Sequence, residues 1–364
     1  MPTEKPTVFF TSAIPERLDR SLTLPARFMR LLDRMPIGER VKGKSVVIKM
    51  HLGGALGYST IHPLFVKLLV DHIKKGKPKK LVVSDSDVKN ASDRGYTKET
   101  VGAPLAPALG KDGNDVVLKR TGWPRLKTVR VGRMVKEADV LINFSHVKGH
   151  GDCGFGGACK NLAMGCVPGR TRREIHALEG KLTWDRAKCI RCNKCIEECP
   201  TQANRFTEDG EYTIFWHHCR MCWHCMLACP TGAIQIEQRQ FDLFQEGLAR
   251  SAKCVLDTFR PGLVFHINVL TDITIFCDCW GMTTPALVPD IGIMASEDIV
   301  AVDSASLKAI KTKDVIPGSI TPPYKLGKGR HLFEKLHARD PFVQVRALER
   351  LGMGLADARI VRVK

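Results

Sequence analysis

The sequence predicts an α/β protein whose mostly parallel sheet is interrupted by a small α+β insert rich in cysteine. Strand-length apolar runs alternate with helical segments on both sides of residues 181–240, an order typical of parallel sheets. Eight of the 14 cysteines fall inside those residues, in two copies of one spacing pattern. We therefore expect the α/β domain to comprise residues 1–180 and 241–364, with the insert at 181–240.

The predicted elements of the α/β domain follow from apolar periodicity. Before the insert, strands are expected at Ser45–Met50, Leu81–Ser84, Asp115–Lys119 and Asp139–Phe144, with a helix at His62–Lys75. Pro63 fits the first turn of that helix, where a missing N–H costs nothing. After the insert, we expect strands at Gly262–Leu270 and Arg359–Val363, and helices at Ile299–Ile310 and near Val343–Leu351.

The insert carries the pattern C-x2-C-x2-C-x3-C-P twice, which is typical of proteins that hold two [4Fe–4S] clusters. Three cysteines of each copy bind one cluster, and the fourth binds the other. This assigns Cys189, Cys192, Cys195 and Cys229 to the first cluster, and Cys219, Cys222, Cys225 and Cys199 to the second. The alternative is a pair of structural zinc sites, which usually have a longer spacer between CxxC pairs.

Short strands are expected to frame the insert, as in a two-cluster ferredoxin. They are placed at Trp184–Lys188, Glu208–Ile214 and Thr231–Ile236.

The composition favours a cytoplasmic protein that meets a charged partner. No apolar run is long enough to span a membrane, and the first residues lack the apolar core of a signal peptide. The net charge is +18, and residues 1–180 contribute +15 of it, with 32 Lys and Arg against 17 Asp and Glu. Such a surface attracts an acidic redox partner protein or a small anionic substrate, unless it is simply a solvated lysine-rich face. Nucleic acid is not expected as a partner because the sequence has no nucleic-acid-binding motif.

A glycine-rich loop at 146–161 follows the predicted strand Asp139–Phe144. Loops at the carboxyl ends of parallel strands are where α/β sheets place ligand sites. Lys160 is predicted to bind an anionic substrate, and His146 or His150 to transfer protons. The alternative is a purely structural glycine loop.

Six further cysteines lie outside the doubled pattern: Cys153, Cys159, Cys166, Cys254, Cys277 and Cys279. The Cys277-Asp278-Cys279 turn could chelate a metal or form a redox pair, and with Cys153, Cys159 and Cys166 it could build a third metal site of unknown metal. The alternative is that these are reduced thiols that lie in the core or contact a substrate, because no spacing among them is diagnostic.

Over nearly its whole length the chain resembles the domain of unknown function 362 family, in the form with an internal two-cluster ferredoxin. The resemblance rests on Thr60–Pro63, on His146–His150 and Gly156–Leu162, and on Asp290–Gly292 with Asp298–Asp303. The family implies an architecture but no established reaction. A more distant resemblance is to lactate-racemase-type proteins, through Gly156–Lys160, Pro168-Gly169 and His176. It implies that Lys160 and His176 face a common pocket.

Two functions follow as expectations. The chain is either an oxidoreductase component that passes single electrons through the clusters to the loop with Lys160, or a non-catalytic carrier that docks a larger redox enzyme. Whether it is an enzyme stays undecided from the sequence.

Overall fold

The computed structural model describes residues 4–54, 57–179, 182–199, 202–214, 224–236, 241–281, 283–322 and 324–364. An eight-stranded sheet forms its centre, in the order β16-β1-β15-β14-β7-β2-β3-β4. Its strands are β1 (Thr7–Ser12), β2 (Ser45–Lys49), β3 (Lys80–Asp85), β4 (Leu105–Pro107), β7 (Val140–His146), β14 (Val264–Leu270), β15 (Gly292–Ser296) and β16 (Arg359–Arg362). Five of the seven neighbouring pairs are parallel, and only β15 runs antiparallel to its two neighbours. The fold is therefore α/β with a mostly parallel sheet, as predicted.

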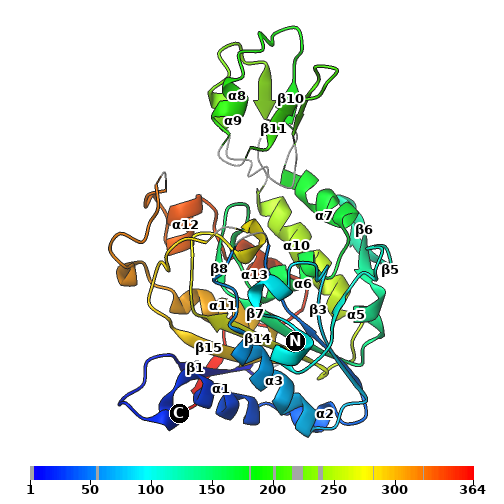
Figure 1. The fold of residues 1–364 in the computed structure, drawn as a ribbon, viewed down its shortest axis with the longest axis vertical. Coiled ribbons are helices and arrows are strands. Elements are labelled where there is room, and N and C mark those ends of the chain that lie inside the picture. The colour runs from blue at the N-terminus through cyan, green and yellow to red at the C-terminus, as the bar shows by residue number, and fades with distance from the viewer. Residues whose placement is uncertain are drawn as a thin grey trace.

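Helices cover both faces of the sheet (Figure 1). One face packs on α1 (Leu24–Asp33), α2 (Ile37–Arg40) and α3 (Pro63–Lys75). The other face packs on α6 (Ala158–Gly165), α10 (Phe241–Leu256), α11 (Ile299–Ala309) and α13 (Val343–Arg350). Successive residues of β2 alternate between the two cores, with Val46 and Ile48 on one side and Val47 on the other. This alternation follows from the two-residue period of a strand and fixes which side each helix covers.

Smaller elements surround this centre. They are the hairpins β5 (Val116–Trp123) with β6 (Leu126–Gly132) and β8 (Lys148–His150) with β9 (Gly154–Gly156), and the helices α4 (Lys98–Val101), α5 (Arg133–Glu137), α7 (Gly169–His176) and α12 (Leu332–His337). The strand expected at Asp115–Lys119 lies in β5, which pairs with β6 and not with the central sheet. Its alternating half-buried pattern suits a hairpin that is exposed on one face.

The insert forms a separate body that projects from one end of the sheet domain, at the top of Figure 1. Strand β10 (Leu182–Trp184) pairs with β13 (Ile234–Ile236), and β11 (Asn204–Phe206) pairs with β12 (Tyr212–Ile214). Helices α8 (Lys194–Glu197) and α9 (His224–Leu227) contain Cys195 and Cys225, respectively. The first strand ends at Trp184, so the expected strand Trp184–Lys188 was placed too late in the chain.

Candidate functional site

Polar side chains gather where the parallel strands β2, β3, β7 and β14 end. His51 follows β2, Asp85 closes β3, and His146 closes β7. The Cys277-Asp278-Cys279 turn follows β14 across a short loop. Because β14 pairs with β7, and β7 with β2, these carboxyl ends lie at one edge of the sheet. This edge is where α/β sheets bind ligands.

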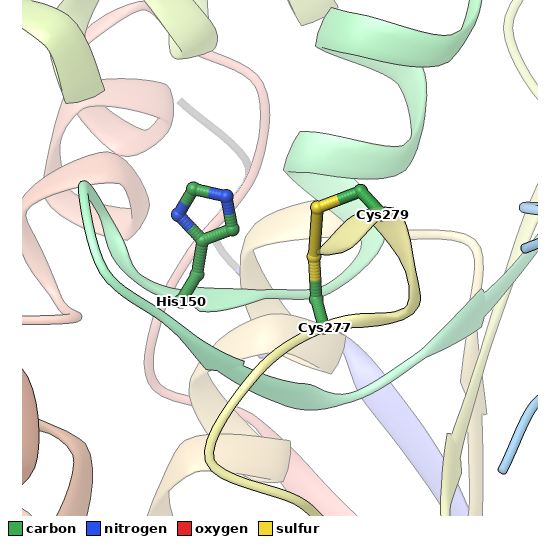
Figure 2. Close-up of side chains that lie close together, drawn as sticks. All are labelled: His150, Cys277 and Cys279. Atoms are coloured by element: carbon green, nitrogen blue, oxygen red, sulfur yellow. A yellow bond between two sulfur atoms is a disulfide. The ribbon is translucent and has the colours of Figure 1, made fainter. Parts of the chain in front are cut away.

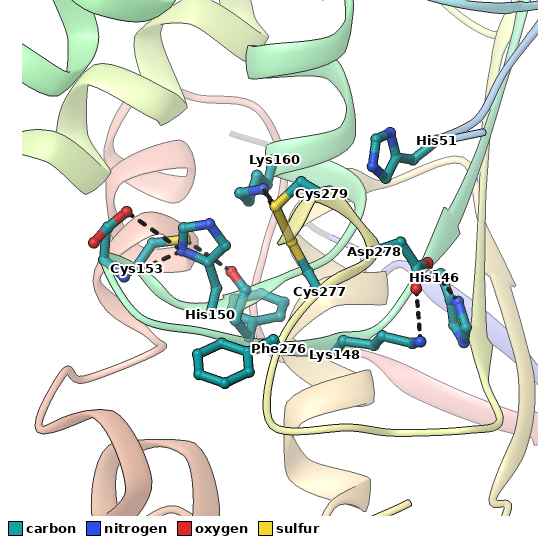
Figure 3. The surroundings of a disulfide bond; sticks show 12 residues. His51, His146, Lys148, His150, Cys153, Lys160, Phe276, Cys277, Asp278 and Cys279 are labelled. Carbon is teal, nitrogen blue, oxygen red and sulfur yellow. Dashed lines mark hydrogen bonds and ion pairs between the residues drawn. A yellow bond between two sulfur atoms is a disulfide. The ribbon is translucent and has the colours of Figure 1, made fainter. Parts of the chain in front are cut away.

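A pair of sulfur atoms lies at the centre of this edge. Cys277 and Cys279 form a disulfide across the one-turn 3-10 helix η4 (Asp278–Trp280). The Lys160 Nζ atom approaches both sulfur atoms at 3.5 Å (Figure 3). Cys277 is buried and Cys279 is exposed. Burial lowers the pKa of Lys160 below its ordinary value.

His150 approaches the same sulfur pair from the hairpin β8–β9 (Figure 2). One of its ring nitrogens and the two sulfur atoms all lie within 4.8 Å of one another. Imidazole and thiolate are ligands that zinc and other soft metals accept, so these three residues could hold a metal if the disulfide were reduced. The His150 Nδ1 atom accepts a hydrogen bond of 3.1 Å from the backbone N–H of Asp152.

Asp278, between the two cysteines, is the centre of a buried ion cluster. Its carboxylate accepts a hydrogen bond from His146 Nδ1 at 2.9 Å and another from Lys148 Nζ at 2.7 Å. His146 Nε2 also lies 2.7 Å from the carbonyl oxygen of Thr271. Both ring nitrogens of His146 therefore face oxygen acceptors, a carboxylate and a carbonyl.

His146 and Lys148 determine the charge of Asp278. Burial alone would raise the pKa of this carboxyl, but His146 and Lys148 together lower it below its ordinary value. Lys148 also donates to the backbone and hydroxyl oxygens of Ser59, at 2.6 and 2.7 Å. The cluster therefore fixes the turn between the two cysteines to β7, β8 and the 57–62 segment.

A second buried cluster lies at the ends of β2 and β3. The Asp85 carboxylate pairs with Lys49 Nζ at 3.0 Å and with His51 Nδ1 at 2.8 Å. Lys49 also donates to the Asn161 side-chain oxygen of α6 at 2.7 Å. Burial would raise the pKa of Asp85, but Lys49 and His51 lower it, so this carboxyl is ionised as well.

His176 belongs to a third cluster, next to the sulfur pair. Its Nδ1 atom is 2.9 Å from a Glu179 oxygen, and its ring stacks on Phe244 with centroids 4.8 Å apart. Asp152, His176 and Glu179 each offer one ligand atom within 4.8 Å of the others. An Asp152 oxygen also lies 4.0 Å from His150 Nδ1, so Asp152 stands between the two histidines.

Helix α6 determines where Lys160 lies. The buried Asp303 carboxylate of α11 accepts hydrogen bonds from the N–H groups of Ala158 and Cys159, at 2.8 and 2.9 Å. Gly157 permits this approach, because a Cβ atom there would lie 2.6 Å from an Asp303 oxygen. A carboxylate at this position also interacts favourably with the helix dipole. Gly157 in the glycine-rich loop therefore allows Asp303 of α11 to cap the first turn of α6, which carries Lys160.

The remaining free cysteines of the α/β domain are buried. Burial raises the pKa of the Cys153 and Cys159 thiols, and it raises that of Cys166 to about 12. The Cys153 thiol donates to the Phe155 carbonyl oxygen at 3.1 Å. These properties are those of inert core thiols. Among the described residues, Cys277 and Cys279 belong to a group with metal-ligand spacing, whereas Cys153, Cys159 and Cys166 belong to none.

The described cysteines of the insert lie in or beside two small apolar groups. Cys189, Cys192 and Cys225 lie within electrostatic reach of Cys195, and Cys229 packs on the small apolar group formed by Cys195, Cys225 and Ile234. Cys199 packs separately, beside Ala203 and Ile214. Gathered free thiols are the donor set that a [4Fe–4S] cluster takes. Cys219 and Cys222 lie outside the described residues.

The structure thus brings Lys160 and His150 to the sulfur pair, and it places His146 and His176 in neighbouring ion clusters. The sequence reasoning missed Lys49, His51, Asp85 and Asp303. Three of them stand at the ends of predicted strands, so the rule that carboxyl ends converge could have found them. Asp303 lies within a predicted helix, and nothing local indicates that it caps another one.

Comparisons with known proteins match parts of the chain to a ferredoxin and to subunits of redox enzymes. Pyruvate synthase subunit PorD of Methanocaldococcus jannaschii is 38% identical over 50 residues, which are 14% of this chain and 58% of that protein. A ferredoxin of Pyrobaculum islandicum is 36% identical over 50 residues, 14% of this chain and 47% of that one. A tetrathionate reductase subunit of Archaeoglobus fulgidus is 30% identical over 122 residues, 33% of this chain and 56% of that one. The chain thus spans about half the length of these curated relatives, and the likeness supports a ferredoxin-like domain.

Among solved structures, the lactate racemase apoprotein of Thermoanaerobacterium thermosaccharolyticum aligns with 74% of this chain and 52% of its own. The TM-score is 0.37 and the identity 13%. In the described part of the chain, no helix combines the length and apolar character needed to cross a bilayer. The model of the family named "Domain of unknown function (DUF362)" matches residues 46–308, which contain both the sulfur pair and the insert. The chain belongs to the DUF362 family.

Proposed function

We propose that this protein is an iron–sulfur electron-transfer protein, an oxidoreductase component that passes single electrons from a redox partner through two [4Fe–4S] clusters to the carboxyl edge of the sheet. The observation that carries the proposal is the doubled C-x2-C-x2-C-x3-C-P pattern. Support comes from the relatives whose names are ferredoxin and subunits of redox enzymes. When bound, such clusters supply single-electron transfer.

The residues of the sheet edge have separate roles in this proposal. Lys160 provides a positive charge beside the sulfur pair, and His150 provides a ring nitrogen for proton movement. His146 acts as a positioning residue, because both of its ring nitrogens are engaged and it holds Asp278. His176 is joined to His150 through Asp152, which offers a path for protons between the two histidines.

Anaerobic purification with iron and sulfide analysis tests the clusters. We expect about eight irons per chain, and a paramagnetic signal after reduction. Cys195→Ser removes one expected ligand and lowers the iron content by about half. Cys254→Ser serves as the matched control, because this buried helical cysteine lies outside both motifs and leaves the iron content unchanged. Colourless protein with less than about one iron per chain contradicts the proposal.

A second candidate is a carrier that docks a larger redox enzyme and has no chemistry of its own. It is favoured by the names of two relatives, which are subunits of larger enzymes, and by the charge of +15 on residues 1–180, which suits an acidic partner. Anaerobic affinity purification at low salt separates the two functions. A stoichiometric protein complex that dissociates as the salt concentration is raised supports the carrier. An isolated chain that has oxidoreductase activity without a partner protein supports the oxidoreductase.

A further inference from the structure

The Cys277–Cys279 cross-link does little to hold the fold together. It joins residues only two apart, and the stabilisation that a disulfide gives through the unfolded chain grows with the length of the loop it closes. The turn is already fixed by Asp278, which pairs with His146 and Lys148. A disulfide that is not needed for stability, at the ligand-binding edge of the sheet, is suited to a chemical role.

The two sulfur atoms differ in access. Cys279 is exposed and Cys277 is buried, with 7% of its surface accessible. In thiol–disulfide exchange, an accessible thiolate attacks the substrate and a protected second thiol completes the reaction. The turn therefore has the arrangement that an attacking and a resolving cysteine require.

A positive charge stands beside both sulfur atoms. Lys160 Nζ lies 3.5 Å from each of them, held there by α6, whose first turn is capped by Asp303. A neighbouring ammonium stabilises a thiolate and has no comparable attraction to a neutral disulfide. Lys160 therefore favours the reduced pair over the oxidised one, and it disfavours a second cation at the same place.

We infer that Cys277 and Cys279 are a redox-active dithiol/disulfide pair, the electron acceptor of the α/β domain, and that they reduce a disulfide substrate. This inference rests on the proposed function, because the insert is the entry point for the electrons. The reductant is a one-electron carrier of the ferredoxin class, used twice for each disulfide.

Electrons and protons balance over the whole cycle. Two electrons and one proton from solvent break the Cys277–Cys279 bond, giving one thiol and one thiolate that pairs with the Lys160 ammonium. The Cys279 thiolate then attacks a substrate disulfide, forms a mixed disulfide and releases the first substrate thiolate. Cys277 loses its proton to that thiolate and attacks the Cys279 sulfur, which restores the cross-link and releases the second thiolate. With the solvent proton that this second thiolate takes up, two electrons and two protons convert one substrate disulfide into two thiols.

Anaerobic reductive titration of the full chain tests the inference. Wild-type protein should take up about four electrons, two at the clusters and two at the sulfur pair. Cys279→Ser should take up about two at unchanged iron content, and Cys254→Ser about four. Alkylation and peptide mapping should label Cys277 and Cys279 only after the reduction. An uptake of about two electrons by wild-type protein that retains about eight irons overturns this inference and leaves the proposed function standing.

Lys160 provides a second readout. Lys160→Met should disfavour the dithiol form about tenfold, which makes the midpoint potential of the pair about 30 mV more negative, and Lys160→Arg should restore it. An unchanged potential in Lys160→Met contradicts the role given to the ammonium. Zinc or another metal bound by both sulfur atoms in protein purified without oxygen also overturns the inference, because the pair would then be a metal centre. Protein without iron contradicts the proposed function and removes the electron source, and the iron analysis identifies this case.

Discussion

His266 shows how burial sets the charge of a single side chain in this sheet. It lies in the middle of β14, only 2% exposed, and its Nδ1 atom is 3.0 Å from the Asn143 side-chain nitrogen. Burial lowers the pKa of His266 from 6.5 to about 3, so the folded protein holds it neutral while the unfolded chain takes up a proton below pH 6.5. Its contribution to stability is complete above pH 6.5 and is lost as the pH falls towards 3.

The free energy of unfolding should therefore fall by about 1 kcal/mol between pH 6.5 and pH 5.5 through this histidine alone. We expect His266→Gln to lack that part of the decrease, whatever its stability at pH 7.5. Urea unfolding of both proteins at several pH values measures the difference. Parallel pH profiles for the two proteins would show that His266 is charged in the fold or exposed to solvent.

Asp278 is expected to contribute more to stability than any exposed acid. Asp278→Asn removes the buried negative charge that pairs with Lys148 and His146 and leaves the Lys148 ammonium without its carboxylate. Breaking a buried pair in this way costs about 3 kcal/mol, which the shift of the urea midpoint measures. Asp257→Asn is the control, because its pair with Lys253 is exposed and contributes less than about 0.5 kcal/mol. Equal midpoints for the two variants would contradict the cluster described here.

Single residues were predictable from the sequence only where their signal is local. The prediction of the cluster cysteines rests on spacing alone, because spacing determines how a short loop presents its thiols. The ion partners of Asp278 could not be predicted, since His146 and Lys148 are more than 100 residues away in the chain. The same applies to the contact between Lys160, which was predicted as a site residue, and Cys277, because the two are 117 residues apart in the sequence.

Helix α6 is the element on which the proposed chemistry depends. Its first turn is capped from α11 by Asp303, which is fully buried and also accepts from the Asn268 amide at 2.8 Å. Asp303→Ala leaves three donors without an acceptor, so we expect a loss of about 3 kcal/mol and faster hydrogen exchange at residues 158–160. Thr97→Ala removes an exposed cap from α4 and should cost about 1 kcal/mol without affecting α6. Unchanged exchange at 158–160 in Asp303→Ala would contradict the cap.

The elements that the sequence revealed are those with a clear period. The helix predicted at His62–Lys75 is α3, and the strand predicted at Asp139–Phe144 is β7, because each has a strong apolar pattern. Strand β15 was missed, since Gly292–Ser296 is short and entirely buried, and such a run shows no alternation. It owes its strand conformation to pairing with β1 and β14. Its antiparallel direction cannot be inferred from its own residues.

At the scale of the whole molecule, the insert and the sheet domain have separate apolar cores. The two large cores of the described chain contain no residue between 182 and 236, whereas the two small ones contain only residues of the insert. The insert enters and leaves through β10 and β13, which pair with each other, Leu182 opposite Ile236. Paired strands lie about 5 Å apart, so the two ends of the sheet domain meet where the insert begins.

Replacement of residues 182–236 by a short glycine–serine linker should therefore leave the sheet domain folded. Helices η3 (Ala177–Glu179) and α10, which flank the insert, pack on each other and keep the junction closed. We expect the free energy of unfolding of the shortened chain, measured with urea, to stay within about 1 kcal/mol of that of the α/β transition in the full chain, because closing so short a loop costs little. Iron should be absent, and the Cys277–Cys279 pair should still be reduced by dithiothreitol but no longer through a ferredoxin-type carrier. A shortened chain that cannot fold would show that the two bodies form a single cooperative unit, and the division of the chain at 181–240 would then be wrong.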